Sequence, residues 1–160
     1  MKPAIRTIAL VALRRGGEVL LMSGFDRVKQ RTFYRAPGGG IEFGETAEAA
    51  ARREILEELE VEIGELHQLG ILENLFTLEG VPGHEVVFIF EADWPEGMPT
   101  PSTFEAREDD GTPFTCHWLP IDDLHDRPGV EGEVVPPGFL SLLGQHASAA
   151  RSTGTICTSA

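Results

Sequence analysis

Cysteines and long apolar runs are the scarcest features of this 160-residue sequence. Its two cysteines, Cys116 and Cys157, lie far apart and form no Cys-x-x-Cys pair. Neither a zinc site nor a disulfide framework is therefore expected, and a reducing, cytoplasmic setting fits. No apolar segment approaches the roughly 20 residues that span a bilayer. The apolar run 8–13 is shorter than a signal-peptide core, lacks a small-residue cleavage site and ends in two arginines, so we predict a strand there and no membrane partner.

Positive charge is also scarce. The chain has 13 Lys and Arg against 26 Asp and Glu, a formal net charge of -13. Nonspecific binding to nucleic acid depends on Lys and Arg that neutralise phosphates, so long nucleic acid is not an expected partner. A small polyanion could still bind if a metal ion supplied local positive charge. The length and the 41% hydrophobic content predict one domain over 1–145, and the tail 146–160, poor in apolar residues, is expected to be disordered.

The pattern of apolar segments and turn residues places strands on both sides of a central helix. Strands are expected at 5–13, 18–23, 67–80, 84–94 and 114–120, and polar loops at 24–36 and 95–113. Thr46 is the expected N-cap of the central helix, with Glu48 in its first turn, and a second helix is expected around 138–145. This order predicts an α/β (α+β) class in which helices cover a mixed sheet.

The central helix carries carboxylates on one arc. Glu54, Glu57 and Glu58 are spaced i, i+3, i+4, so they share an arc of about 100° beside the apolar seam of the helix. Ionised groups that converge there need a compensating cation, and Arg53 can reach Glu57 one turn on. An oxygen-only ligand set suits Mg²⁺ or Mn²⁺. The alternative is an acidic helix face that is simply solvated.

The segment around this helix resembles the Nudix box, Gly-x5-Glu-x7-Arg-Glu-U-x-Glu-Glu-x-Gly-U, in which U is a bulky aliphatic residue. The matching residues are Gly39, Glu45, Arg53, Glu54, Ile55, Glu57, Glu58 and Val61. Glu60 stands where the family has glycine, which usually ends the helix in a left-handed conformation, and a non-glycine residue there costs about 1 kcal/mol. The strand order is also similar to that of a Nudix domain, an α/β/α sandwich with a mixed sheet.

The resemblance implies hydrolysis of a phosphoanhydride (pyrophosphate) bond in a nucleoside diphosphate linked to another moiety. Nucleoside triphosphates and their damaged forms, ADP-ribose, nucleotide sugars and dinucleoside polyphosphates all stay open as the small-molecule substrate. It also implies that Glu54, Glu57 and Glu58 bind Mg²⁺ or Mn²⁺, with the carbonyl of Gly38 contributing. Bound metal would neutralise the pyrophosphate and lower the pKa of the attacking water.

Other residues would support this chemistry. Glu45 and Arg53 are expected to orient the loop and the metal-binding glutamates by hydrogen bonds. The general base stays open among Glu57 and Glu58 in the box and Glu105 and Glu108 in the loop before 114–120, although a loop glutamate is more often just solvated. 

Groups outside the box would select the substrate. Basic residues that could hold phosphate are Arg27, Lys29, Arg31 and Arg35, and aromatic residues that could stack on a base are Phe33, Tyr34 and Phe76. Core packing is the alternative for each aromatic side chain, and a solvated surface is the alternative for the basic loop. For His84 we expect a hydrogen-bonded structural role more than a substrate contact.

Two other functions compete with catalysis. A Nudix domain can lose activity and serve as a nucleotide-ligand sensor or binding module, but such drift would erode the three glutamates, which are all present. Alternatively, the acidic helix could bind metal for structure alone. Dimerisation is common in the family, so a homodimer is possible, although no segment specifies it.

Overall fold

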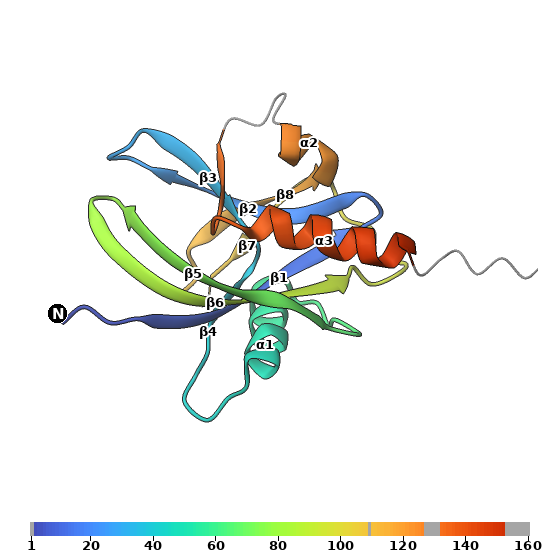
Figure 1. The fold of residues 1–160 in the computed structure, drawn as a ribbon, viewed down its shortest axis with the longest axis horizontal. Coiled ribbons are helices and arrows are strands. Elements are labelled where there is room, and N and C mark those ends of the chain that lie inside the picture. The colour runs from blue at the N-terminus through green and yellow to red at the C-terminus, as the bar shows by residue number, and fades with distance from the viewer. Residues whose placement is uncertain (1, 109, 127–131, 153–160) are drawn as a thin grey trace, which may run out of the picture.

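The computed structural model describes residues 2–108, 110–126 and 132–152 (Figure 1). Within them, three helices accompany a nine-stranded sheet. The strands are β1 (Arg6–Arg15), β2 (Glu18–Asp26), β3 (Arg31–Arg35), β4 (Gly38–Gly40), β5 (His67–Leu78), β6 (Val81–Asp93), β7 (Thr103–Arg107), β8 (Pro113–Pro120) and β9 (Glu133–Val135). The helices are α1 (Ala47–Leu59), α2 (Ile121–Asp126) and α3 (Phe139–Ser152). None of the described helices is long and apolar enough to cross a membrane.

The sheet is mixed, as predicted, and its path runs β5-β6-β1-β2-β3-β9. β1 pairs in parallel with β6 along most of its length, while its antiparallel pairing with β2 involves only Arg14 and Arg15. At the other end of β1, residues 8–10 pair with β4 instead. The sheet therefore contains two strand groups, β5-β6-β1-β4 and β3-β2-β8-β7. Among the described residues, these groups pair with each other only at Arg14 and Arg15 of β1, and they separate along the rest of that strand.

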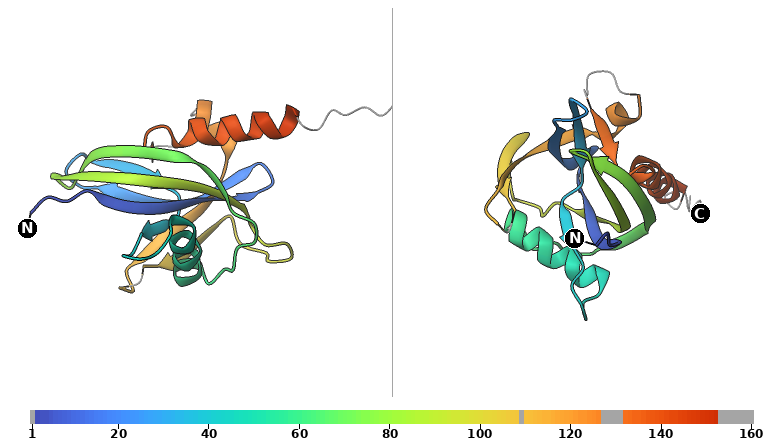
Figure 2. Two further views of the ribbon diagram at one scale, coloured as in Figure 1. Left: turned by 60° about the horizontal axis from the view of Figure 1, so that its bottom comes forward. Right: turned by 90° about the vertical axis from the view of Figure 1, so that its left-hand side faces the viewer.

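Both faces of β1 are buried, which explains its continuous apolar sequence. Ala9, Val11 and Leu13 belong to one core cluster together with Ala50, Ala51 and Ile55 of α1. The alternate residues Ile8, Leu10 and Ala12 belong to a second cluster with Phe139 and Leu143 of α3. Figure 2 shows α1 and α3 on opposite faces of the sheet, so the α/β/α prediction is confirmed.

Two regions expected to be loops contain strands. In 24–36, β2 extends to Asp26 and β3 follows, because the Asp26 carboxylate accepts hydrogen bonds from the backbone N–H groups of Val28 and Lys29 and so forms a tight turn. The loop 95–113 contains the edge strand β7. The glycine run forms β4, whose pairing with β1 is a long-range contact that local sequence does not display.

The ends of α1 follow local chemistry. Thr46 is the N-cap, and its Oγ1 accepts a hydrogen bond from the N–H of Ala49 at 3.1 Å, as predicted. Glu60 has φ 57° and ψ 34°, the left-handed conformation expected where the Nudix box has glycine.

The last helix is longer than expected from the sequence. α3 continues to Ser152, past the expected start of the tail at 146, and residues 153–160 lie outside the described residues.

The conformation of Glu60 yields a stability prediction. The Glu60→Gly variant should exceed a Glu60→Ala variant in free energy of unfolding by about 1 kcal/mol, because glycine adopts a left-handed backbone without a Cβ penalty. Urea unfolding of both variants and the natural chain measures this difference. The alanine control removes the same charge, so equal stability of the two variants would contradict the prediction.

Candidate functional site

Arg53 on α1 joins the loop before the helix to the carboxylates on the helix. Its guanidinium donates hydrogen bonds to Glu45 (2.8 Å from Nε), Glu54 (3.0 Å) and Glu57 (3.1 Å). It also donates to the carbonyl of Gly40 at 2.9 Å, which ties the end of β4 to the helix. The hydrogen bond from Arg53 holds the pKa of Glu45 at about 2, so this carboxyl is ionised. The structure thus brings Glu45 and Arg53, both candidates from the sequence, together with two glutamates of the helix.

Glu54 and Glu58 are buried between α1 and β4. The backbone N–H of Gly38 donates a hydrogen bond to Oε2 of Glu58 at 3.3 Å. Gly39 lies against Glu54, since a Cβ placed on Gly39 would come within 2.5 Å of the carboxylate carbon. The glycine run therefore lets the backbone of β4 approach the carboxylates closely. Glu57 is the outer member of the three, with 39% of its side chain exposed.

The loop after β7 adds a fourth carboxylate. Burial is the largest cause of a pKa of about 9 for Glu58, and the adjacent carboxylates of Glu108 and Glu54 raise it further, while Arg35 opposes them. The structure thus brings Glu108 and Arg35, both candidates from the sequence, to the carboxylates of α1. Glu105 is an exposed residue of β7.

This donor set fits a hard divalent cation in its chemistry. All the side-chain donors are carboxylate oxygens, and the raised pKa of Glu58 shows that burying these charges together is unfavourable without added positive charge. In this structure, however, Glu54 and Glu57 accept hydrogen bonds from Arg53. Over the described part of the chain, no three His, Cys, Asp or Glu side chains are gathered in a group that could hold a metal ion.

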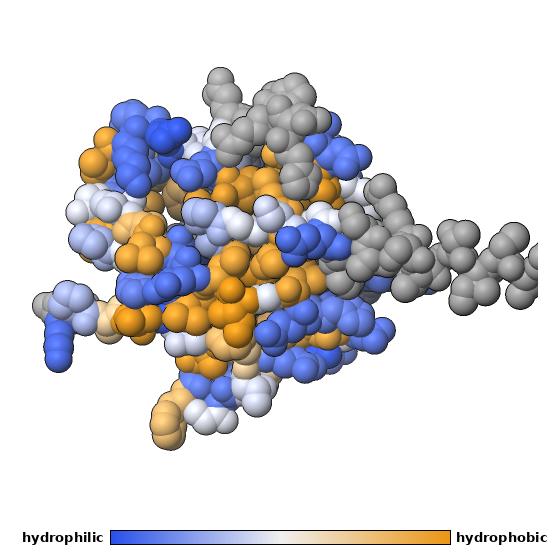
Figure 3. Space-filling view, in the orientation of Figure 1, coloured by the Kyte–Doolittle hydropathy of each residue, from blue (hydrophilic) through white to orange (hydrophobic). Residues whose placement is uncertain are grey.

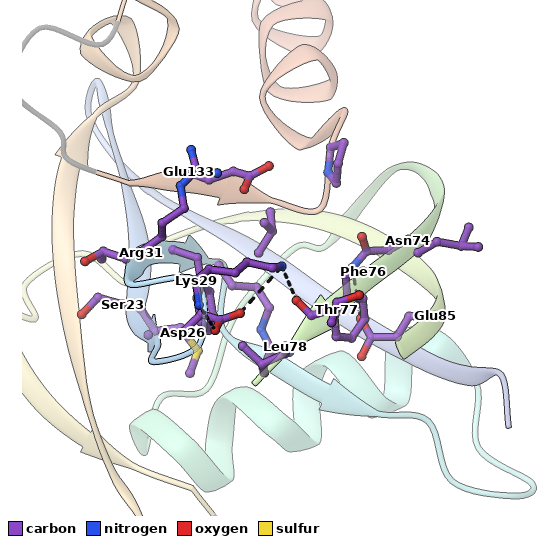
Figure 4. Close-up of a pocket in the computed structure, with 18 of the residues that line it drawn as sticks. Ser23, Asp26, Lys29, Arg31, Asn74, Phe76, Thr77, Leu78, Glu85 and Glu133 are labelled. Atoms are coloured by element: carbon purple, nitrogen blue, oxygen red, sulfur yellow. Dashed lines mark hydrogen bonds and ion pairs between the residues drawn. The ribbon is translucent and has the colours of Figure 1, made fainter. Parts of the chain in front are cut away.

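A cavity of about 840 Å³ extends from this cluster into the space where the two strand groups separate (Figure 4). Glu108 and Arg35 line it at the carboxylate end, and residues of the β2–β3 and β5–β6 hairpins line it farther on. Candidates from the sequence that line it are Lys29, Arg31, Phe33, Arg35, Phe76 and Glu108. One cavity therefore connects the acidic cluster with aromatic and basic side chains.

Three other candidates from the sequence lie elsewhere. Arg27 is 81% exposed and pairs with Glu79 at 3.0 Å. The ring of Tyr34 meets the ring of His117 edge-on, with 5.8 Å between centroids. His84 contacts Glu73 at 2.8 Å, in agreement with a hydrogen-bonded structural histidine.

Contacts between the tips of the two hairpins border the cavity. An oxygen of Asp26 accepts a hydrogen bond from the N–H of Glu79. Lys29 donates a hydrogen bond to the carbonyl of Thr77 (Figure 4). Arg27 adds its ion pair with Glu79. We call these contacts the hairpin latch. The cavity is thus bordered by two hairpins that contact each other at their tips.

Sequence reasoning missed Asn74 and Glu85 as residues of the cavity wall. A signal was present in the sequence. Glu85 is in phase with the buried Val87 and Ile89 along β6, so strand alternation places its side chain on a buried face.

Figure 3 shows the apolar surface that continues over the β5–β6 hairpin, where the exposed apolar residues are Ile71, Leu75, Leu78 and Val81.

Solved structures share this fold. A MutT NUDIX hydrolase from Burkholderia pseudomallei aligns with a TM-score of 0.62 at 22% identity, covering 89% of this chain and 98% of that one. An ADP compounds hydrolase aligns with a TM-score of 0.63 at 19% identity, covering 96% of this chain and 77% of the other. At these identities the likeness concerns the fold alone.

Sequence comparisons identify the family to which the chain belongs. An oxidized purine nucleoside triphosphate hydrolase of Danio rerio is 37% identical over 126 residues, which are 74% of this chain and 75% of the relative. The NAD-capped RNA hydrolase NudC of Pseudomonas syringae pv. tomato is 31% identical over 79% of this chain, which spans only 40% of that relative. The model of the NUDIX domain matches residues 3–136. With the box residues placed between α1 and β4, this match shows that the chain belongs to the Nudix hydrolase family.

Proposed function

We propose that this protein is a divalent-metal-dependent pyrophosphohydrolase that cleaves a phosphoanhydride bond of a nucleoside triphosphate. The observation that carries the proposal is the cavity with aromatic and basic walls whose lining includes Glu108 and Arg35, two residues that interact with Glu58 of α1. A nucleoside triphosphate is favoured among the possible substrates because the zebrafish relative, which aligns over three quarters of its length, is named for such substrates. The cytoplasmic location and a homodimer stay predictions.

The metal would be Mg²⁺ or Mn²⁺, held by Glu54, Glu57, Glu58 and the carbonyl of Gly38. When bound, it would neutralise the pyrophosphate and lower the pKa of the attacking water. Its charge would also relieve the repulsion that raises the pKa of Glu58.

The chain's own groups would position the reactants. Arg53 fixes the directions of Glu54 and Glu57, and Glu45 in turn fixes Arg53 through two hydrogen bonds. Arg35 lines the cavity near Glu58 and would bind phosphate oxygens. Of the candidate bases we favour Glu108, because its carboxylate lies beside Glu58 and lines the cavity, where it can take a proton from water.

Turnover tests this proposal directly. We expect release of phosphate or nucleotide from nucleoside triphosphates with Mg²⁺ or Mn²⁺, and a loss of about 100-fold or more in Glu57→Gln and in Glu58→Gln, since each removes a metal ligand. ADP-ribose, a nucleotide sugar and a dinucleoside polyphosphate complete the panel. Glu48→Gln is the matched control, because Glu48 lies on the same helix and pairs with Arg52. If no compound turned over but one raised the melting temperature, the protein would be a nucleotide sensor.

Chelation separates a catalytic metal from a structural one. We expect EDTA to abolish turnover while it shifts the melting temperature only slightly, because Mg²⁺ usually keeps several waters and adds little to folding stability. Restored turnover after excess Mg²⁺ is the control. A large drop in melting temperature would instead favour a metal that serves structure.

Arg53 provides a test of positioning. In Arg53→Lys we expect Mn²⁺ affinity to fall about 10- to 100-fold, because an ammonium cannot reproduce the fork of hydrogen bonds to three glutamates. Titration of Mn²⁺ followed by electron paramagnetic resonance measures this affinity. Arg52→Lys serves as control, since Arg52 points to Glu48 and the carbonyls of 63 and 64. Equal Mn²⁺ affinity in the two variants would contradict the assigned role.

A further inference from the structure

A buried polar pair forms part of the cavity wall, far from the box in sequence. Asn74 on β5 is 7% exposed and Glu85 on β6 is 4% exposed. The two residues are direct partners across the strands, and Arg6 on β1 is the partner of Glu85 on its other side. All three line the cavity and form one row across three strands. Figure 4 shows Asn74 and Glu85 on the wall of the cavity.

The contacts that Glu85 makes are weak for a buried carboxylate. Nδ2 of Asn74 lies 3.4 Å from Oε2, and Nη1 of Arg6 lies 3.5 Å from Oε1. Hydrogen bonds between charged groups are usually about 2.7–2.9 Å, and the Arg6 side chain is 65% exposed. Across the described residues, then, this carboxylate has no short partner, although burial makes a poorly bonded charge costly. Its acceptor capacity is available to a ligand in the cavity.

Flat aromatic surfaces line the same cavity. Phe76 lies two residues from Asn74 on the same face of β5, and its cross-strand partner is Gly83. A Cβ on Gly83 would come within 2.3 Å of the Phe76 ring, so the ring lies directly against the backbone. Phe33 lies against Gly24 in the same way, on the other hairpin. Both rings line the cavity, which therefore suits a planar ring system.

Charge fixes the direction in which a nucleotide would lie. A phosphate at Glu85 would meet a buried carboxylate whose nearest cation, Arg6, is 65% exposed and already pairs with it, whereas Arg35 lies near Glu58 and the proposed metal site. The base would therefore be the part of the ligand that reaches Glu85.

We propose that Glu85 and Asn74 determine base specificity, and that they select a base edge carrying two adjacent N–H donors. Guanine offers such an edge, with its ring N1–H beside an exocyclic amine, and one carboxylate can accept both in parallel. Adenine places an acceptor nitrogen beside its amine, so its edge would oppose the lone pairs of Glu85. This inference rests on the proposed function, since it assigns the cavity to a nucleotide.

Kinetics with matched nucleotides test the pair. We expect kcat/KM for GTP to exceed that for ITP, which lacks only the exocyclic amine, and that for ATP by about 10- to 100-fold. In Glu85→Gln the preference for GTP should shrink about tenfold or more while turnover of ATP is retained. Glu73→Gln is the control, because Glu73 is a 66%-exposed residue of β5 whose contact is to His84. A merely structural Glu85 would lower all three rates together, and that result would overturn the proposal.

Binding of the products separates this inference from the proposed function. Calorimetric titrations of GMP, IMP and AMP should show tighter binding of GMP in the natural chain, so the comparison does not depend on the folding of a variant. Selective GMP binding without turnover of any nucleotide would support the role of the pair while refuting the hydrolase. Turnover of GTP, ITP and ATP at equal kcat/KM would support the hydrolase and overturn the role of the pair.

Discussion

The repulsion among buried carboxylates between α1 and β4 is the constraint on which the rest of the structure depends. Glu54 and Glu58 are buried, and the backbone of β4 can lie against Glu54 only because residue 39 is glycine. Arg53 balances part of the charge, and its hydrogen bonds simultaneously fix the loop before the helix. The remaining imbalance appears as the raised pKa of Glu58. A bound cation would balance this remaining charge, which is why the proposed function includes a divalent metal.

The sheet explains how Glu108 and Arg35 come to share one cavity with the aromatic and basic side chains of the two hairpins. Residues 8–10 of β1 pair with β4, whereas Arg14 and Arg15 at its C-terminal end pair with β2. The strands on the two sides of β1 therefore diverge. The space between them begins at Glu108 and Arg35, beside the carboxylates, and ends at the hairpin latch. Residues that are distant in sequence therefore line one cavity.

Local chemistry predicted much of this arrangement. The spacing of Glu54, Glu57 and Glu58 and the cap at Thr46 follow from helix geometry, which acts within a few residues. The left-handed conformation at Glu60 was expected only from the resemblance to the Nudix box, which has glycine there. The strand at β4 and the β2–β3 hairpin were missed, since β4 depends on a partner far along the chain and the turn depends on Asp26 accepting backbone hydrogen bonds. The wall formed by Asn74 and Glu85 was missed for a related reason, because strand pairing alone brings those two side chains together.

The glycines beneath Phe33 and Phe76 help to set the width of the cavity. The positions of both rings depend on the absence of a side chain at Gly24 and Gly83, since any Cβ there would displace the ring. The width available to a ligand is therefore encoded partly by residues that contribute no side chain to recognition. Among related sequences, a change from glycine to alanine at either position would narrow or tilt the compartment while every recognising side chain stayed the same. Divergence in substrate range within such a family can thus proceed through positions that a comparison of contact residues would overlook.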